Sequence, residues 1–130
     1  MKKVILSLAV VATISLLGCK NEQKQASETT ETSSNMTIQE ASFGVRGNCE
    51  MCKKTIEMAA NDVEGVTSAV WDVDKKKINV SFDKSKTTTE AIHNAIAASG
   101  YDTQNLAGSQ EAYSNLPACC KYDHDMTMNQ

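Results

Sequence analysis

Two cysteines three positions apart, Cys49 and Cys52, are the residues of this chain with the most evident capacity for chemistry. Their thiols could form a disulfide, exchange with other thiols as a redox couple, supply one corner of a zinc site, or clamp a soft metal ion. The spacing of one cysteine pair does not separate these uses. The rest of the sequence must therefore decide between them.

A second group of sulfur and imidazole side chains lies near the C-terminus. Its members are Cys119, Cys120, His124, Met126 and Met128. Thiolate, imidazole and thioether groups are ligands of soft transition-metal ions, and methionine stays usable where thiols oxidise. We interpret the group as a candidate additional metal element; the alternative is a terminal segment in which these residues occur by chance. A disulfide between adjacent cysteines closes a strained ring, which argues against a structural disulfide there.

The fifth cysteine, Cys19, ends an N-terminal segment that is typical of an export signal. Two lysines precede an apolar stretch over residues 4–17, which is too short to span a bilayer comfortably. The sequence Leu-Leu-Gly-Cys at positions 16–19 resembles the lipobox of bacterial lipoproteins, in which the cysteine is acylated and the segment before it is removed. An ordinary signal peptide with an incidental cysteine is the alternative.

From this we predict a lipoprotein signal peptide over residues 1–18 and lipidation of Cys19. The protein would then be anchored to a membrane of the bacterial cell envelope, facing the periplasm or the cell surface. Acyl chains give stable attachment when two or more are present, because each buried methylene contributes about 0.8 kcal/mol.

The remaining chain divides into three parts. Residues 20–37 contain no branched aliphatic or aromatic side chain, so we predict a lipid-anchored flexible linker over residues 19–37. Residues 38–107 carry the periodic apolar pattern of one small domain, and residues 108–130 form a C-terminal extension. Without residues 1–18, 11 basic residues stand against 16 acidic ones and form no long basic stripe, which argues against nucleic acid as a partner.

Alternating apolar residues predict the strands of the domain. They indicate strands at 41–46, 69–73 and 78–82, and less clearly a fourth at 101–106. Trp71 lies in the inward-facing alternation of the second strand, so we expect it in the core.

Apolar residues at helical spacing predict two helices between these strands. The first helix presents one face made of Cys52, Ile56, Ala59 and Val63. It ends before Gly65, and the second helix runs from a cap at Thr87 or Thr88 to Gly100. The order βαββαβ predicts an α+β, ferredoxin-like sandwich in which two helices cover one face of a four-stranded antiparallel sheet.

The cysteine pair in this setting resembles the heavy-metal-associated domain family, which includes copper chaperones, modules of metal-pumping ATPases and the periplasmic mercury-binding protein. The resemblance covers roughly residues 40–107 and rests on four motifs. These are Cys49-x-x-Cys52, Val63-Glu64-Gly65-Val66, Ile78-x-Val80-x-Phe82-Asp83 and Ala91-Ile92-x-x-Ala95-Ile96-x-x-x-Gly100-Tyr101. The family usually has Gly-Met-x-Cys where this chain has Gly47-Asn48-Cys49, so we expect a metal loop of different shape.

The resemblance implies a non-enzymatic protein that binds a soft metal ion through Cys49 and Cys52 and passes it to a metal transporter or another metal-binding protein. A helix N-terminus favours thiolates. Two thiolates suit Cu(I), the favoured ion, or Hg(II), better than tetrahedral Zn(II), which remains a candidate. Tyr101 is expected beside the metal loop in a supporting role, and His93 in solvent. The metal-free protein is expected to be a monomer.

A thiol–disulfide oxidoreductase that uses the same two cysteines is the alternative function. The chain lacks room for a thioredoxin-like fold, and its single proline, Pro117, is not where that family places its cis-proline. A structural disulfide and an interaction module that no longer binds metal are further alternatives.

The lipobox generates the first testable prediction. Cys19→Ala should release the protein from the membrane fraction or mislocalise it, because the acyl chains have no other attachment site in the motif. Membrane fractionation and the intact mass of the purified protein measure the effect. A variant that still fractionates with membranes and keeps the wild-type lipid mass would contradict the lipoprotein interpretation.

Overall fold

The structure is a computed structural model in which residues 36–128 are described. The predicted signal peptide, the lipidation candidate Cys19 and most of the predicted linker lie outside the described residues. Within the part of the chain that is described, no helix is both long and apolar enough to cross a membrane.

Three antiparallel strands form the sheet: β1 (Ile38–Gly44), β2 (Val66–Asp72) and β3 (Lys77–Asp83), in the order β1-β3-β2. The central strand β3 places Ile78 opposite Phe43 of β1 and opposite Trp71 of β2. These three side chains are buried on the same face of the sheet. The alternation predicted from the sequence therefore positions the core correctly.

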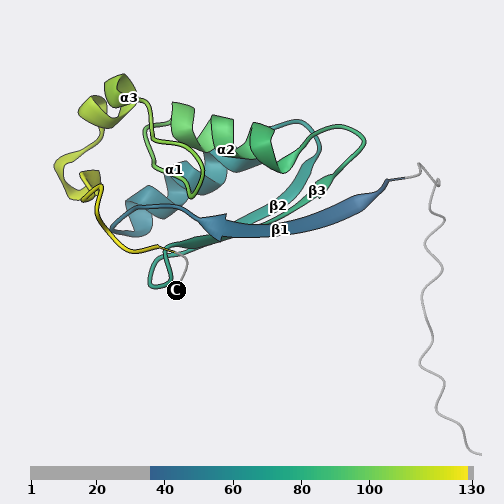
Figure 1. The fold of residues 1–130 in the computed structure, drawn as a ribbon, viewed down its shortest axis with the longest axis horizontal. Helices are drawn as coiled ribbons and strands as arrows, with labels where there is room; N and C mark the ends of the chain where they lie inside the picture. The colour runs from purple at the N-terminus through teal and green to yellow at the C-terminus, as the bar shows by residue number, and fades with distance from the viewer. Residues whose placement is uncertain (1–35, 129–130) are drawn as a thin grey trace, which may run out of the picture. The chain divides into compact units, whose positions relative to one another are not determined.

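Two helices, α1 (Glu50–Asn61) and α2 (Thr89–Ala98), cover that face of the sheet (Figure 1). Thr88 caps α2 by accepting a hydrogen bond from the Ala91 amide at 3.2 Å, which resolves the choice between two capping threonines. Gly100, with φ of +95°, ends the helix in a left-handed conformation, as predicted. The predicted α+β, ferredoxin-like class is confirmed.

The predicted fourth strand at 101–106 is not a strand: the described residues contain three. This segment makes one antiparallel bridge, between Val45 and Thr103. The pairing stops there because the chain turns at once: the Thr103 amide donates to the Leu106 carbonyl at 2.8 Å, and the Leu106 amide donates to the Thr103 hydroxyl at 3.0 Å. A local turn thus competes successfully with extension of the sheet.

His93 lies in the core and not in solvent, so its predicted exposure is wrong. Its side chain stacks on the ring of Phe43 with 3.8 Å between ring centroids. Burial lowers the pKa of His93, which keeps the imidazole neutral beside the sheet. Its flat apolar face substitutes for an aliphatic side chain, a use of histidine that helical spacing alone does not reveal.

Trp71 is fully buried, as predicted, and it links three elements. Its indole nitrogen donates to the Val45 carbonyl at 3.0 Å, beyond the end of β1. Its backbone amide donates to the Glu57 carboxylate of α1 at 2.8 Å. The side chain of Trp71 therefore fixes the end of β1 relative to β2, and its backbone amide ties β2 to α1.

The C-terminal extension packs on the domain as a short helix, α3 (Gln110–Asn115), followed by a 3₁₀ turn, η1 (Ala118–Cys120). Both lie at the end of the sandwich where α1 begins (Figure 1). Tyr113 and Leu116 pack against the core, and Tyr122 is buried. This part of the extension is a folded element, in agreement with its apolar residues.

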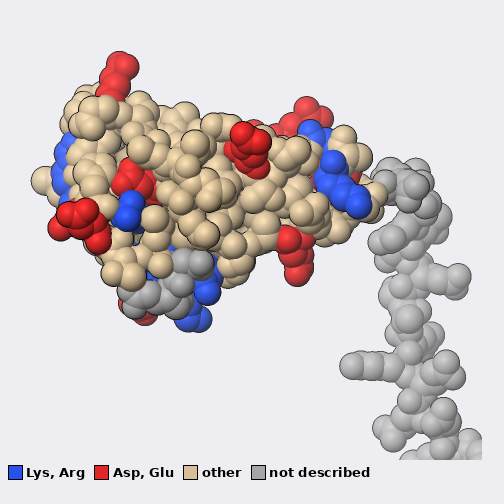
Figure 2. Space-filling view, in the orientation of Figure 1, with Lys and Arg blue, Asp and Glu red and all other residues tan. Residues whose placement is uncertain are grey.

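Acidic and basic side chains are interspersed on the face shown in Figure 2, where uncharged residues cover most of the surface. No patch of a single charge sign dominates this view. The visible charges are those of a solvated surface.

Replacement of Trp71 by phenylalanine should destabilise the domain by about 1–3 kcal/mol, because the Val45 carbonyl then loses its buried donor and a void remains. Urea unfolding followed by circular dichroism measures the change. Val70→Ala, on the exposed side of the same strand, is the matched control and should change stability by less than about 0.5 kcal/mol. Equal effects of the two substitutions would contradict the role given to Trp71.

Candidate metal centre

The first cysteine pair lies where the loop after β1 enters α1. Cys49 is the N-terminal capping residue of α1, with extended backbone (φ −151°, ψ 176°), and Cys52 follows in the first turn. The Cys49 and Cys52 sulfur atoms are 3.6 Å apart, and the Asn48 amide donates to the Cys52 sulfur at 3.3 Å. Cys49 is partly exposed and Cys52 is fully buried. One thiol therefore faces solvent and the other faces the core.

The start of α1 favours the ionised form of Cys49. The Cys52 backbone amide is the main cause that lowers the pKa of the Cys49 thiol; burial opposes it, and the Cys52 thiol adds to the lowering. Amides at a helix N-terminus stabilise negative charge by hydrogen bonding and through the helix dipole. Lys53 is partly engaged by Glu57, with 3.7 Å between nitrogen and oxygen. The backbone, more than the lysine, thus prepares the thiolate.

The loop has its own support in place of the methionine that the family usually carries. A Cβ atom on Gly47 would lie 3.0 Å from the Trp71 ring and 3.1 Å from the Cys52 Cβ atom. The indole therefore fills the space beneath the loop, and a side chain at position 47 would push against it. Met51, inside the cysteine pair, is about half exposed and supports nothing beneath the loop.

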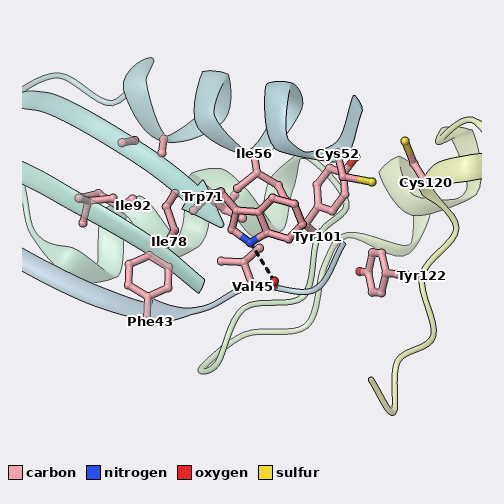
Figure 3. Close-up of a cluster of buried hydrophobic side chains, with 14 of the residues drawn as sticks. Phe43, Val45, Cys52, Ile56, Trp71, Ile78, Ile92, Tyr101, Cys120 and Tyr122 are labelled. Atoms are coloured by element: carbon pink, nitrogen blue, oxygen red, sulfur yellow. Dashed lines mark hydrogen bonds between the residues drawn. The ribbon is translucent and has the colours of Figure 1, made fainter. Parts of the chain in front are cut away.

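The tail brings the second cysteine pair to the first. The sulfur atoms of Cys49, Cys119 and Cys120 all lie within 4.8 Å of one another. Cys119 and Cys120 are 3.9 Å apart, sulfur to sulfur, and Cys120 also interacts with the Cys52 thiol. Figure 3 shows Cys52 and Cys120 facing the same space between the start of α1 and the tail. Three thiols thus form one group, and Cys52 adjoins it through Cys49 and Cys120.

Asn48 joins the cysteine loop to the tail. Its side-chain amide donates to the Lys121 carbonyl at 3.0 Å and to the Cys119 carbonyl at 3.4 Å. Sequence analysis did not single out Asn48. The signal was nonetheless available, because Asn48 stands where the chain departs from the family motif.

Tyr122 holds the tail against the turn that follows α2. Its hydroxyl donates to the Gly100 carbonyl at 2.9 Å and accepts from the Asp102 amide at 2.8 Å. The Tyr113 hydroxyl in turn donates to the Tyr122 carbonyl at 2.8 Å. Glycine is needed at position 100, since a Cβ atom there would lie 2.7 Å from the Tyr113 nitrogen. Sequence analysis did not single out Tyr122; the available signal was an aromatic residue two positions after the tail cysteines.

Tyr101 lies beside Cys52, as Figure 3 shows. Its side chain is fully buried and its hydroxyl has no partner at hydrogen-bond geometry. Burial raises the pKa of Tyr101, and the neighbouring Cys52 and Cys120 thiols raise it further, so the hydroxyl keeps its proton. Burial also raises the pKa of Cys120 to about 12, and the Cys52 thiol adds to this.

The other candidate ligands of the tail lie in a different group. His124 Nδ1 is 2.7 Å from the Asp102 carboxylate, which also pairs with Arg46 at 3.2 Å. Burial opposes ionisation of Asp102, yet the Gly108 amide and His124 hold its pKa below the usual value. Met126 packs against the core, and its carbonyl accepts a hydrogen bond from Arg46 at 2.8 Å. Met128 lines a shallow pocket beside Arg46.

The structure thus brings Cys49, Cys52, Cys119 and Cys120 together and gives His124 and Met126 structural contacts elsewhere. A thiol cluster in which the amides of α1 lower the pKa of Cys49 can bind a soft cation or form disulfides. Among the described residues, the group of candidate ligand atoms at this place contains no carboxylate.

Comparison with known proteins locates the same domain. The family model for the heavy-metal-associated domain matches residues 47–102. Copper chaperone CopZ of Staphylococcus haemolyticus is 35% identical over 57 residues, covering 44% of this chain and 84% of that protein. CopZ of Staphylococcus aureus is 36% identical over 55 residues, covering 42% and 81%. The crystal structure of oxidized MerP from Ralstonia metallidurans CH34 aligns at 29% identity with a TM-score of 0.50, covering 52% and 96%.

The thiols should differ in reactivity with pH. Cys49 should be alkylated at lower pH than Cys120, because the amides of α1 favour its thiolate while burial disfavours that of Cys120. Iodoacetamide labelling of the reduced protein, read per cysteine by fragmentation mass spectrometry across pH, measures the order. The difference should vanish in denaturant, and modification of Cys120 before Cys49 in the folded protein would contradict this description of the site.

Proposed function

The chain belongs to the heavy-metal-associated domain family, and from this premise we propose that it binds a soft metal ion, preferentially Cu(I), through Cys49 and Cys52 and transfers it to another protein. The observation that carries the proposal is the placement of the two sulfur atoms, 3.6 Å apart at the N-terminus of α1. A helix N-terminus lowers the pKa of a thiol, so ionisation is favoured here without a strong neighbouring base.

The chemistry of the site favours soft ions over hard ones. Thiolates select Cu(I), Hg(II) and Zn(II) over magnesium or calcium, which require oxygen ligands. Among these ions Cu(I) is the first choice, because two thiolates satisfy it and because the two curated relatives described above are named copper chaperones. Hg(II) is the next, since two thiolates suit this soft ion as well.

Transfer requires that an incoming ligand reach the ion. Cys49 is partly exposed at the rim of the domain, whereas Cys52 is buried against Tyr101 and Trp71. An acceptor thiol can therefore attack on the Cys49 side and displace that ligand first. The acceptor would be a metal transporter or another metal-binding protein that carries thiolates of its own.

The place of action is the bacterial cell envelope in this proposal. The support is the lipobox-like sequence that ends at Cys19, which would tether the domain to a membrane surface. An anchored carrier would meet membrane transporters by diffusion in two dimensions. The proposal assigns no catalytic step to the chain.

Cys49→Ser should weaken Cu(I) binding by at least about 100-fold, because it removes a metal ligand. Loss of a residue that only hydrogen-bonds to a ligand already lowers metal affinity by about 10–100-fold. Competition with a chromophoric Cu(I) chelator under anaerobic, reducing conditions measures the affinity. Ser114→Ala, an exposed tail substitution, is the control and should bind as the wild type does.

The same preparations separate metal transfer from the redox alternative. The wild-type protein should not catalyse insulin reduction. Catalytic reduction of insulin together with unchanged Cu(I) affinity in Cys49→Ser would replace this proposal with a thiol–disulfide oxidoreductase.

A further inference from the structure

The tail cysteines lie beside the loop cysteines although the whole domain separates them in the sequence. We propose that Cys119 and Cys120 are ligands of the same ion, so that loop and tail together hold it with at least three thiolates. The proposal rests on the metal binding proposed above, and it concerns residues beyond the family match, which ends at residue 102.

The sulfur spacing suits three or four ligands better than two. Thiolates about 2.3 Å from an ion lie about 4.6 Å apart in linear coordination and about 3.8–4.0 Å apart in trigonal or tetrahedral coordination. The Cys49–Cys52 and Cys119–Cys120 sulfur separations are 3.6 and 3.9 Å. Cys49, Cys119 and Cys120 need to contract only slightly from the 4.8 Å that bounds their group.

Contacts that involve no metal hold the tail thiols in place. The buried Tyr122 hydroxyl makes two hydrogen bonds with the turn after α2, and Asn48 holds the carbonyls of Cys119 and Lys121. The tail is therefore ordered by folding, and an arriving ion does not have to order it. Ligands that are positioned in advance bind more tightly, because little conformational entropy is lost on binding.

An unpartnered hydroxyl points to the same place. Tyr101 is fully buried, its hydroxyl makes no hydrogen bond of good geometry, and the thiols of Cys52 and Cys120 are the polar groups that interact with it. A buried donor without a partner of good geometry is uncommon in folded proteins, so its position beside the thiols calls for a functional explanation. The Tyr101 hydroxyl would donate a charge-assisted hydrogen bond to a metal-bound thiolate at Cys52 or Cys120.

The extra thiolates change both the choice of ion and the route of transfer. A two-thiolate site does not satisfy Zn(II), whereas a site with up to four does. With the tail docked, the Cys119 and Cys120 thiols lie beside the Cys49 thiol, so an acceptor thiol that displaces Cys49 must displace the tail ligands as well before it takes the ion. The tail occupies the position that a partner's thiol would otherwise take.

X-ray absorption of the full reduced chain loaded with one equivalent of Cu(I) tests the proposal. The wild type should show at least three sulfur neighbours and the double variant Cys119→Ser/Cys120→Ser two. Zn(II) affinity should fall by about 100-fold or more in the double variant, because each lost ligand costs at least as much as the 10–100-fold typical of a supporting contact. Cu(I) affinity should fall less, since two thiolates remain.

Two further variants guard against a trivial loss of folding. Cys119 is exposed, so Cys119→Ser alone leaves the buried part of the tail intact and should remove one sulfur neighbour. Ser114→Ala keeps every thiol and should match the wild type. Thermal unfolding of all variants, without metal, reports whether the domain is intact.

The outcomes separate this proposal from the one on which it rests. A wild-type protein that binds Cu(I) through two sulfurs, with Zn(II) affinity unchanged in the double variant, overturns the shared site alone. Binding of two ions, reduced to one in the double variant, also overturns it, because the tail would then be a separate site. A wild type that takes up no Cu(I) overturns both proposals.

Discussion

The packing of Trp71 beneath the cysteine loop is the contact on which the rest of the site depends. The indole fills the space under Gly47 and Cys52 and is itself tied to the end of β1 through the Val45 carbonyl. The loop therefore cannot collapse inward, and the thiols stay at the edge of the core. Close packing of this kind fixes the position of the loop relative to the core, because an interior at crystal-like density leaves side chains little room to move.

The second constraint is the polar corner around Asp102, which orders the tail. Asp102 is buried, and its carboxylate accepts from Arg46, from the Gly108 amide and from His124 when that ring donates. The Asp102 backbone amide donates a hydrogen bond to the Tyr122 hydroxyl. A buried carboxylate is tolerated only when its hydrogen bonds are satisfied, so residues of both the domain and the tail are needed at this corner. The imidazole of His124 thus stabilises the docked tail.

The two constraints together explain how a small domain presents soft ligands without losing its core. Thiols are weakly polar and are among the side chains most easily buried, so Cys52 and Cys120 contribute to the core while their sulfur atoms face the cluster. At the rim, the amides of α1 lower the pKa of the Cys49 thiol and so favour its thiolate. The division between a buried and a partly exposed thiol gives the cluster a direction from which an exchanging ligand can approach.

The sequence by itself determined the class of fold, the two helices, three strands and the cysteine pair at the start of α1. Those features depend on local periodicity, capping and spacing, which are written in neighbouring residues. Only the tertiary structure decided the rest. A turn at Thr103 replaces the predicted fourth strand. His93 is buried because it stacks on the Phe43 ring. His124 pairs with the Asp102 carboxylate. Asn48 and Tyr122 brought Cys119 and Cys120 to the loop. Such contacts join residues far apart in the chain, and no local pattern records which distant partner a polar side chain will find.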